Sequence, residues 1–291
     1  MSSGPVATRH EPGAPAHAVR IIDALARRAR RHDVACGEGV LVLREWGDGP
    51  ALVLLHGGFG SWLHWVRNID TLAASRRVIA VDLPGLGDST CMPEPVTPEA
   101  IGARVAGAID HCLAAEPGVD LVGFSFGGLV AGQVAACLGA RARSLVLVGA
   151  SGLGLRRRRY ELVRRTPQMD ARALRAAQAH NARTLMLHDP DSLDELALAV
   201  QAHNDARARL KSRRMSLGDS LRQVLPRVHA RLSGIWGEHD ITAIPWVDER
   251  RALLESLHPE LEFRVLPDAG HWVQYEASDA FNALLQRLLT G

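Results

Sequence analysis

The chain has 291 residues, of which 47% are hydrophobic and 23% charged, and its formal net charge is +2. This composition is typical of a globular protein with a sizeable core, and the small net charge points to no particular partner. The sequence has no run of about twenty apolar residues and no apolar core in its first thirty or so positions, which argues against a membrane-spanning helix and a secretory signal; we expect a cytoplasmic protein that does not bind membranes.

The cysteines give no indication of a metal site. Cys36, Cys91, Cys112 and Cys137 lack the close pairing that a zinc or iron–sulfur site requires, and they predict no disulfide framework. We therefore expect no metal and no other cofactor.

The chain begins with a tail through Pro15 that contains Pro and Gly, and its composition predicts disorder. An amphipathic helix is expected near Ala18 to Arg31, because apolar residues such as Ile22 and Leu25 recur at helical spacing. Tail and helix form the predicted N-terminal part, residues 1–32.

Short apolar segments then alternate with helical ones. Val40–Trp46, Ala51–Leu55 and Arg77–Val81 are expected to be strands, and the alternation continues to Val148. This repeated order predicts an α/β protein with a mostly parallel, doubly wound sheet that is covered on both faces.

A glycine-rich loop follows the second of these strands. His56–Gly60 reads HGGFG, and its glycines leave backbone N–H groups free to point at a ligand oxygen. His56 is expected to hold this loop by hydrogen bonds rather than to move protons. Asp82 and Asp88, after the next strand, are expected to shape their own loop.

The most informative motif is GFSFGG, Gly123–Gly128, which follows the apolar run Val119–Val122 and precedes a helix expected from Gly128 to Ala140. It predicts a tight strand-to-helix turn that projects the hydroxyl of Ser125 above the sheet edge. Glycine is needed beside it because a Cβ would meet the adjacent strand and helix. The alternative is an incidental serine in a glycine-rich turn.

The sheet pattern is next interrupted by a segment rich in Ala, Arg and Leu with helical periodicity. We predict a helical cap over residues 152–216, inserted into a core of residues 33–151 and 217–291. A lid over the serine would exclude water and form the substrate pocket, whereas the alternative is a purely structural insertion.

Two further side chains follow predicted strands. Asp240 comes after Leu232–Trp236, and His271 comes after Leu261–Leu266. The carboxyl ends of parallel strands meet at one sheet edge, so both side chains are expected near the serine. Asp240 could instead cap a turn, leaving Glu238 as the carboxylate there, and His271 could be a turn histidine.

These three residue types together favour nucleophilic catalysis. A serine hydroxyl needs a base, and an imidazole has a suitable pKa; its second nitrogen needs a carboxylate that fixes the tautomer. We expect Ser125 to be the nucleophile, His271 the base and Asp240 the orienting carboxylate.

With these motifs the chain resembles the α/β-hydrolase superfamily from about Val40 to the C-terminus. The resemblance implies a Ser-His-Asp serine hydrolase. It also implies an oxyanion hole built from the backbone N–H of Phe126 and that of Gly58 or Phe59, of which we favour Gly58.

Two runs, Gly60–Trp65 and Gly270–Glu276, resemble the meta-cleavage-product hydrolases, which cleave a carbon–carbon bond in vinylogous 1,5-diketones formed during aromatic ring degradation. In that group the residue after the base borders the substrate, which implies this role for Trp272. The residue before the nucleophile is usually asparagine in the group and is Phe124 here, so we expect a more apolar pocket.

The basic residues gather in two short runs. Arg27–Arg31 and Arg156–Arg159 lie on helical patterns without interleaved aromatics, so we expect solvated helix faces and no nucleic-acid partner. The cap arginine that binds the dienoate in meta-cleavage-product hydrolases would be Arg183, Arg207 or Arg209. Most of the remaining histidines are expected in solvent, namely His64, His111, His180, His188, His203, His229, His239 and His258.

The sequence thus predicts a serine hydrolase for a small apolar or aromatic carbonyl compound, with carbon–carbon bond hydrolysis of a meta-cleavage-type diketone as its reaction. The alternatives are a carboxylesterase for small acyl esters and a non-catalytic ligand-binding protein of the same fold. The partner is expected to be a small-molecule substrate, and the sequence leaves a homo-oligomer open.

Overall fold

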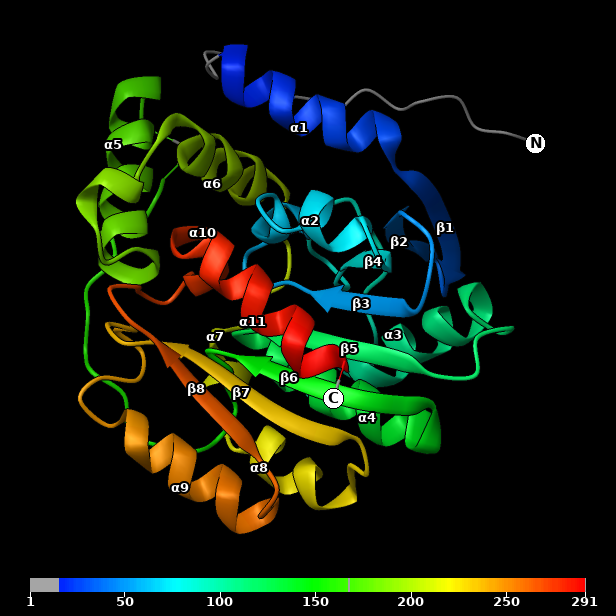
Figure 1. The fold of residues 1–291 in the computed structure, drawn as a ribbon. Coiled ribbons are helices and arrows are strands. Elements are labelled where there is room, and N and C mark those ends of the chain that lie inside the picture. The colour runs from blue at the N-terminus through cyan, green and yellow to red at the C-terminus, as the bar shows by residue number, and fades with distance from the viewer. Residues whose placement is uncertain (1–15, 167, 291) are drawn as a thin grey trace.

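The computed structural model describes residues 16–166 and 168–290. Its strands are β1 (Arg30–Cys36), β2 (Gly39–Trp46), β3 (Ala51–Leu55), β4 (Arg77–Asp82), β5 (Val119–Phe124), β6 (Ala142–Val148), β7 (Arg231–Gly237) and β8 (Glu262–Leu266). They form an eight-stranded sheet in the order β1-β2-β4-β3-β5-β6-β7-β8 (Figure 1). The β1–β2 and β2–β4 pairs are antiparallel, and all later pairs in this order are parallel. The predicted α/β fold with a mostly parallel sheet is confirmed.

Helices cover both faces of the sheet. They are α1 (Ala16–Arg28), α2 (Ile69–Ala73), α3 (Pro98–Cys112), α4 (Phe126–Leu138), α5 (Ala171–Asn181), α6 (Glu195–Arg207), α7 (Arg213–Ser216), α8 (Ser220–Val224), α9 (Val247–Leu257), α10 (Val273–Glu276) and α11 (Ser278–Thr290). Helices α3, α4 and α9 pack on one face, and α1, α2 and α11 pack on the other (Figure 1). Among the helices that the structure describes, none is both long and apolar enough to cross a membrane.

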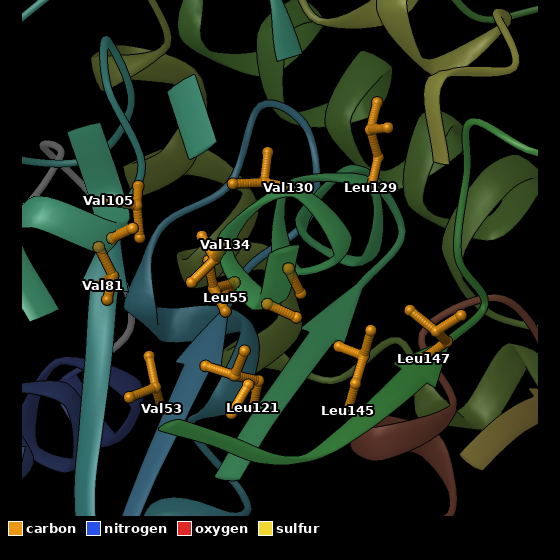
Figure 2. Packing of buried hydrophobic residues seen from close by; sticks show 14 of the residues in the cluster. Val53, Leu55, Val81, Val105, Leu121, Leu129, Val130, Val134, Leu145 and Leu147 are labelled. Carbon is orange, nitrogen blue, oxygen red and sulfur yellow. The ribbon is translucent and has the colours of Figure 1, made fainter. Parts of the chain in front are cut away.

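Alternating side chains of each central strand fill two separate cores. In β3, Val53 and Leu55 join the core under α4 together with Val134 (Figure 2), whereas Leu52 and Leu54 point to the opposite face. A strand that is buried on both faces needs an unbroken apolar sequence, and β3 reads ALVLL.

The N-terminal segment differs from its prediction. The helix expected near Ala18 to Arg31 is α1, which ends at Arg28, and the residues after it form the edge strand β1, which was not predicted. The boundary at residue 32 therefore falls inside a strand. The sequence of β1, RRHDVAC, is charged because this edge strand is partly exposed, and its charge concealed the strand pattern. Residues 1–15, for which disorder was predicted, lie outside the described residues.

The segment between β6 and β7, residues 149–230, is called the inserted segment below. It contains α5, α6, α7 and α8, where the sequence predicted a helical cap over residues 152–216. Its first part, through residue 166, has no helix or strand.

Close packing of β5 against α4 fixes the turn at Ser125. A Cβ on Gly123 would lie 2.4 Å from the carbonyl oxygen of Gly127, and a Cβ on Gly127 would lie 2.3 Å from that of Leu55. Ser125 itself has φ 52° and ψ −114°, a strained conformation for a residue with a side chain. Glycine is therefore required two residues before and two residues after the serine, at Gly123 and Gly127, as predicted.

We expect Gly127→Ala to lower the free energy of unfolding by about 2 kcal/mol, because the new methyl group would collide with backbone atoms of β3. Urea denaturation measures this change. Gly107→Ala is the control, since among the described residues outside its own helix nothing lies within 4 Å of its Cβ position in α3. The control should be neutral or stabilising by about 0.5–1 kcal/mol, and equal stability of the two variants would contradict the packing argument.

Candidate active site

Ser125, His271 and Asp240 meet at the carboxyl ends of their strands. Ser125 lies between β5 and α4, Asp240 follows β7, and His271 follows β8. Nε2 of His271 lies 2.9 Å from Oγ of Ser125, and Nδ1 of His271 lies 2.9 Å from Oδ2 of Asp240. The structure thus brings together the three side chains that the sequence placed at one sheet edge.

Asp240 is fully buried and hydrogen-bonded on both oxygens. Its Oδ1 accepts hydrogen bonds from the N–H of Thr242 at 2.8 Å and from the Thr242 hydroxyl at 2.7 Å. Burial alone would raise the pKa of Asp240, but the facing His271 imidazole and the hydrogen bonds from His271 and Thr242 lower it below its ordinary value. The ionised carboxylate holds the proton of His271 on Nδ1, so Nε2 is left to accept from the Ser125 hydroxyl.

Glu276 holds the loop that carries His271. Its Oε2 accepts from the N–H of Gly270 at 2.7 Å, and its Oε1 accepts from the N–H groups of His188 and Asp189, each at 2.7 Å. These bonds tie the histidine loop to the inserted segment. The sequence assigned no role to Glu276, because this role depends on contacts with a distant part of the chain.

Two buried histidines hold the HGGFG loop. Nδ1 of His56 lies 2.7 Å from the carbonyl oxygen of Gly57, and Nε2 of His56 accepts a hydrogen bond from the N–H of Leu83 at 2.9 Å. Burial lowers the pKa of His56, so the ring is neutral and suits the loop-holding role that was predicted. Nδ1 of His64 accepts from the N–H of Gly57 at 3.2 Å.

The free backbone N–H groups near Ser125 are few. Gly57 uses its N–H for His64, so it has none for a ligand. Phe126 is the first residue of α4, and its N–H therefore has no partner within the helix. Gly58 and Phe59 line the space above the serine and remain the candidates for the second donor.

A cavity of about 540 Å³ opens at Ser125. Its lining includes Gly58 and Phe59 of the HGGFG loop, His64, Phe124, and Leu185 and Met186 of the inserted segment. Phe124, for which a place beside the substrate was predicted, is among these lining residues. Trp272 does not line it: the ring is fully buried, stacks on Tyr275 and donates from Nε1 to the carbonyl oxygen of His64 at 2.9 Å. Trp272 therefore supports the cavity wall from behind.

Arg156–Arg159 were predicted to lie on a solvated helix face, and the helix is wrong. Residues 156–159 form no helix, and Arg157, Arg158 and Arg159 line the cavity together with Arg213 of α7. Arg157 is half-buried, and burial lowers the pKa of its guanidinium. Within residues 16–166 and 168–290, no carboxylate forms an ion pair with Arg157.

The arginines that the resemblance suggested lie elsewhere. Arg183 is exposed, Arg207 binds Asp88 at 3.3 Å, and Arg209 donates to the carbonyl oxygen of Ser89 at 2.6 Å. None of the three is among the described residues that line the cavity.

Two histidines expected in solvent are buried instead. His64 is 3% exposed and His203 is 5% exposed. His64 lies on the short 3₁₀ helix η1 (Trp62–Trp65), whose neighbouring side chains are all in the core. The apolar residues around it in the sequence were the signal that could have indicated its burial.

A group that could hold a metal ion lies outside the cavity. Ligand atoms of Glu238, His239 and Asp268 lie within 4.8 Å of one another among the described residues. Glu238 already accepts from the N–H of Asp268 at 3.2 Å. Exposed groups of this kind are common without a metal, so we assign none.

The sequence pattern of the family described as "Alpha/beta hydrolase family" matches residues 52–284. The chain belongs to this family. It is 29% identical over 263 residues to a 2-hydroxy-6-oxononadienedioate/2-hydroxy-6-oxononatrienedioate hydrolase of Comamonas testosteroni, with 83% of this chain and 88% of the relative covered. It is also 29% identical over 266 residues to a 2-hydroxy-6-oxo-6-phenylhexa-2,4-dienoate hydrolase of Burkholderia cepacia, with 83% and 88% covered.

A longer relative is the dihydrolipoyllysine-residue acetyltransferase component of an acetoin cleaving system of Pseudomonas putida. The two sequences are 30% identical over 238 residues. The match covers 80% of this chain but only 62% of the length of that relative. Among solved structures, an esterase from Rhodococcus sp. ECU1013 has a TM-score of 0.72 at 22% identity, covering 91% of this chain and 99% of the esterase. A meta-cleavage product hydrolase from Pseudomonas fluorescens IP01 has a TM-score of 0.67 at 20% identity, covering 89% and 97%. The predicted resemblance is confirmed, and this α/β hydrolase is similar to meta-cleavage product hydrolases and esterases.

We expect Asp240→Asn to lower kcat by about 10³–10⁴-fold with little change in KM, because an amide favours the wrong imidazole tautomer. Hydrolysis of p-nitrophenyl acetate measures both constants. Glu238→Gln is the matched control at the same strand end and should leave kcat within about twofold. A loss below about tenfold in Asp240→Asn would assign the orienting role to another carboxylate.

Proposed function

We propose that this α/β hydrolase is a serine hydrolase in which Ser125 attacks a carbonyl carbon, His271 acts as base and Asp240 orients the base. The observation that carries the proposal is the continuous chain of hydrogen bonds from Ser125 through His271 to Asp240 at the cavity. Nothing else at the cavity offers a comparable nucleophile and base among the described residues.

The reaction then has two stages. As the Ser125 Oγ–carbon bond forms, Nε2 of His271 takes the hydroxyl proton, and the negative charge on the carbonyl oxygen is held by the N–H groups of Phe126 and Gly58. Collapse of this intermediate releases the leaving group, which receives the proton from His271. Water then attacks the acyl-enzyme with His271 again acting as base, and Ser125 is restored.

The substrate is a small carbonyl compound with an apolar or aromatic body and an anionic group. Phe124, Leu185 and Met186 provide apolar walls, and Arg157 provides an unpaired, half-buried cation. A desolvated guanidinium is costly unless an anion pairs with it, and a substrate carboxylate would supply that anion.

A vinylogous 1,5-diketone that carries a carboxylate fits these requirements. Its carbon leaving group departs as a conjugated enolate, which His271 protonates on carbon. The relatives named as hydrolases of 2-hydroxy-6-oxo dienoates support this reaction, since their named substrates are carboxylates of this class. We propose carbon–carbon bond hydrolysis of a meta-cleavage-type diketone as the reaction.

A carboxylesterase for small acyl esters is the second candidate, and Phe124 favours it. Meta-cleavage-product hydrolases usually have asparagine at this position. The phenyl ring, which is 1% exposed and lies 5.0 Å from the His271 ring, offers no polar contact to a diketone. An ester needs no such contact, because its leaving alkoxide requires only the proton from His271.

The two reactions are separated by assaying the purified protein with p-nitrophenyl acetate and with 2-hydroxy-6-oxo-6-phenylhexa-2,4-dienoate, whose yellow colour is lost on cleavage. We expect turnover of the dienoate and labelling by a fluorophosphonate, with both lost in Ser125→Ala because the nucleophile is absent. Turnover of the ester alone would favour the esterase. Activity of Ser125→Ala near wild type would overturn the nucleophile, and no turnover or labelling would favour a ligand-binding protein.

Arg157→Gln tests the anionic group. We expect it to raise KM for the dienoate by about 10–100-fold, the value of a hydrogen bond to a charged group, and to leave KM for neutral p-nitrophenyl acetate unchanged. Arg183→Gln, at an exposed position outside the cavity, is the control. An equal change in KM for both substrates would show that Arg157 does not recognise a carboxylate.

A further inference from the structure

His64 is a polar residue of the cavity wall that the proposed chemistry does not use. It is 3% exposed and lines the cavity together with Phe124 and Ser125. Its ring is held from two sides, edge-on to Phe124 at 5.4 Å between centroids and against Trp272 at 5.3 Å. Trp272 also fixes its backbone by donating to the His64 carbonyl oxygen. The imidazole therefore has a fixed position and orientation.

The hydrogen bond from Gly57 determines the tautomer of His64. The backbone N–H of Gly57 can only donate, so Nδ1 of His64, at 3.2 Å, must accept. Burial, with smaller contributions from His56 and His271, lowers the pKa of His64 well below its ordinary value. A neutral imidazole whose Nδ1 accepts carries its proton on Nε2.

The Nε2–H group has no conventional acceptor. Throughout the described residues, no oxygen or nitrogen accepts a hydrogen bond from it, and the neighbouring rings of Phe124 and Trp272 could accept only weakly. The donor belongs to a ring that lines the cavity. His64 Nε2 is not among the buried polar atoms that lack a partner, so this donor is open to the cavity, and a ligand oxygen that reached it would gain a hydrogen bond at little cost in ordering the fixed ring.

We propose that His64 is a specificity-determining residue whose Nε2–H donates to an acceptor oxygen of the substrate, a ketone or carboxylate oxygen apart from the carbonyl that Ser125 attacks. This proposal rests on the proposed function, because it requires the substrate to lie against Ser125. The ring is a fixed donor that moves no proton. It selects for substrates with a second oxygen and against protonated amines, which present only N–H groups at this position.

The ring also connects substrate binding to the oxyanion loop. Nδ1 holds Gly57, the residue before Gly58, while Nε2 faces the substrate. Hydrogen bonds at the two nitrogens of one imidazole polarise each other, so a substrate oxygen at Nε2 strengthens the acceptor for Gly57. His64 thus acts on substrate selection directly and on the oxyanion loop as a positioning residue.

Two substitutions separate these roles. The shorter amide of His64→Asn places its oxygen where Nδ1 lies, so it can still accept from Gly57, but nothing reaches the position of Nε2. The longer amide of His64→Gln places an N–H near the position of Nε2 and leaves Gly57 without its acceptor. A purely structural role of His64 would change the melting temperature and the turnover of all substrates alike.

The probes are p-nitrophenyl esters that differ by one ketone oxygen: 4-oxopentanoate against pentanoate, and 5-oxohexanoate against hexanoate. We expect wild type to prefer one of the oxo esters by about tenfold in kcat/KM, mainly through KM. His64→Asn should abolish this preference, and His64→Gln should keep part of it while lowering kcat for all esters. A preference that persists in His64→Asn, or no preference in wild type for either pair, would overturn the proposal.

Binding to Ser125→Ala gives a readout that needs no turnover. Calorimetry with 4-oxopentanoate and pentanoate, and with the matching six-carbon acids, should show tighter binding of one oxo acid in Ser125→Ala and equal binding once His64→Asn is added. Equal binding in both proteins would overturn the role of His64. If wild type hydrolyses no ester or dienoate and resists the fluorophosphonate, the proposed function fails instead, so the two failures are distinguishable.

Discussion

The close approach of β5 to α4 is the constraint on which the candidate site depends. Because Gly123 and Gly127 have no Cβ, the helix can start directly against the strands, and the single residue that turns the chain, Ser125, is held at φ 52°. This strain persists only because the packing around it leaves no alternative. The same turn leaves the first N–H of α4 without a helical partner beside the hydroxyl, so one local constraint places both the proposed nucleophile and a proposed oxyanion donor.

Around the serine, the buried imidazoles of His56 and His64 are neutral, and the buried carboxylate of Asp240 is charged. His56 and His64 are kept neutral by burial and hold the HGGFG loop. Asp240 is kept ionised by His271 and Thr242, although burial opposes its charge. The histidine to which we assign proton exchange, His271, is therefore the one that faces a carboxylate. The histidines that must only hold a loop face backbone groups, and this environment separates roles that the residue type alone does not.

The sequence predicted the sheet and the convergence of Ser125, His271 and Asp240, because buried strands leave long apolar runs and parallel strands end at one edge. It did not predict the cavity wall. Arg157 lies in an irregular segment, whose sequence has no hydrophobic periodicity that could predict its position. The Trp272 ring is turned toward His64 rather than the cavity, and this orientation depends on tertiary contacts. The edge strand β1 was missed because its charges resemble a helix end.

Substrate choice is therefore decided by contacts that no motif encodes. The inserted segment is fixed to the core by side-chain bonds, among them Ser61 to Asn204 at 2.6 Å and Arg67 to Asp194 at 2.6 Å, besides those of Glu276. Beside Arg157, the inserted segment is held by Arg250, which donates to the carbonyl oxygen of Arg156 at 2.6 Å. Under the proposed mechanism, an ester and a diketone form the same kind of tetrahedral intermediate at Ser125, so only groups that contact the rest of the substrate can discriminate between them. The wall residues lie outside the hydrogen-bond chain from Ser125 to Asp240, so the wall can change the substrate while that chain of hydrogen bonds stays the same.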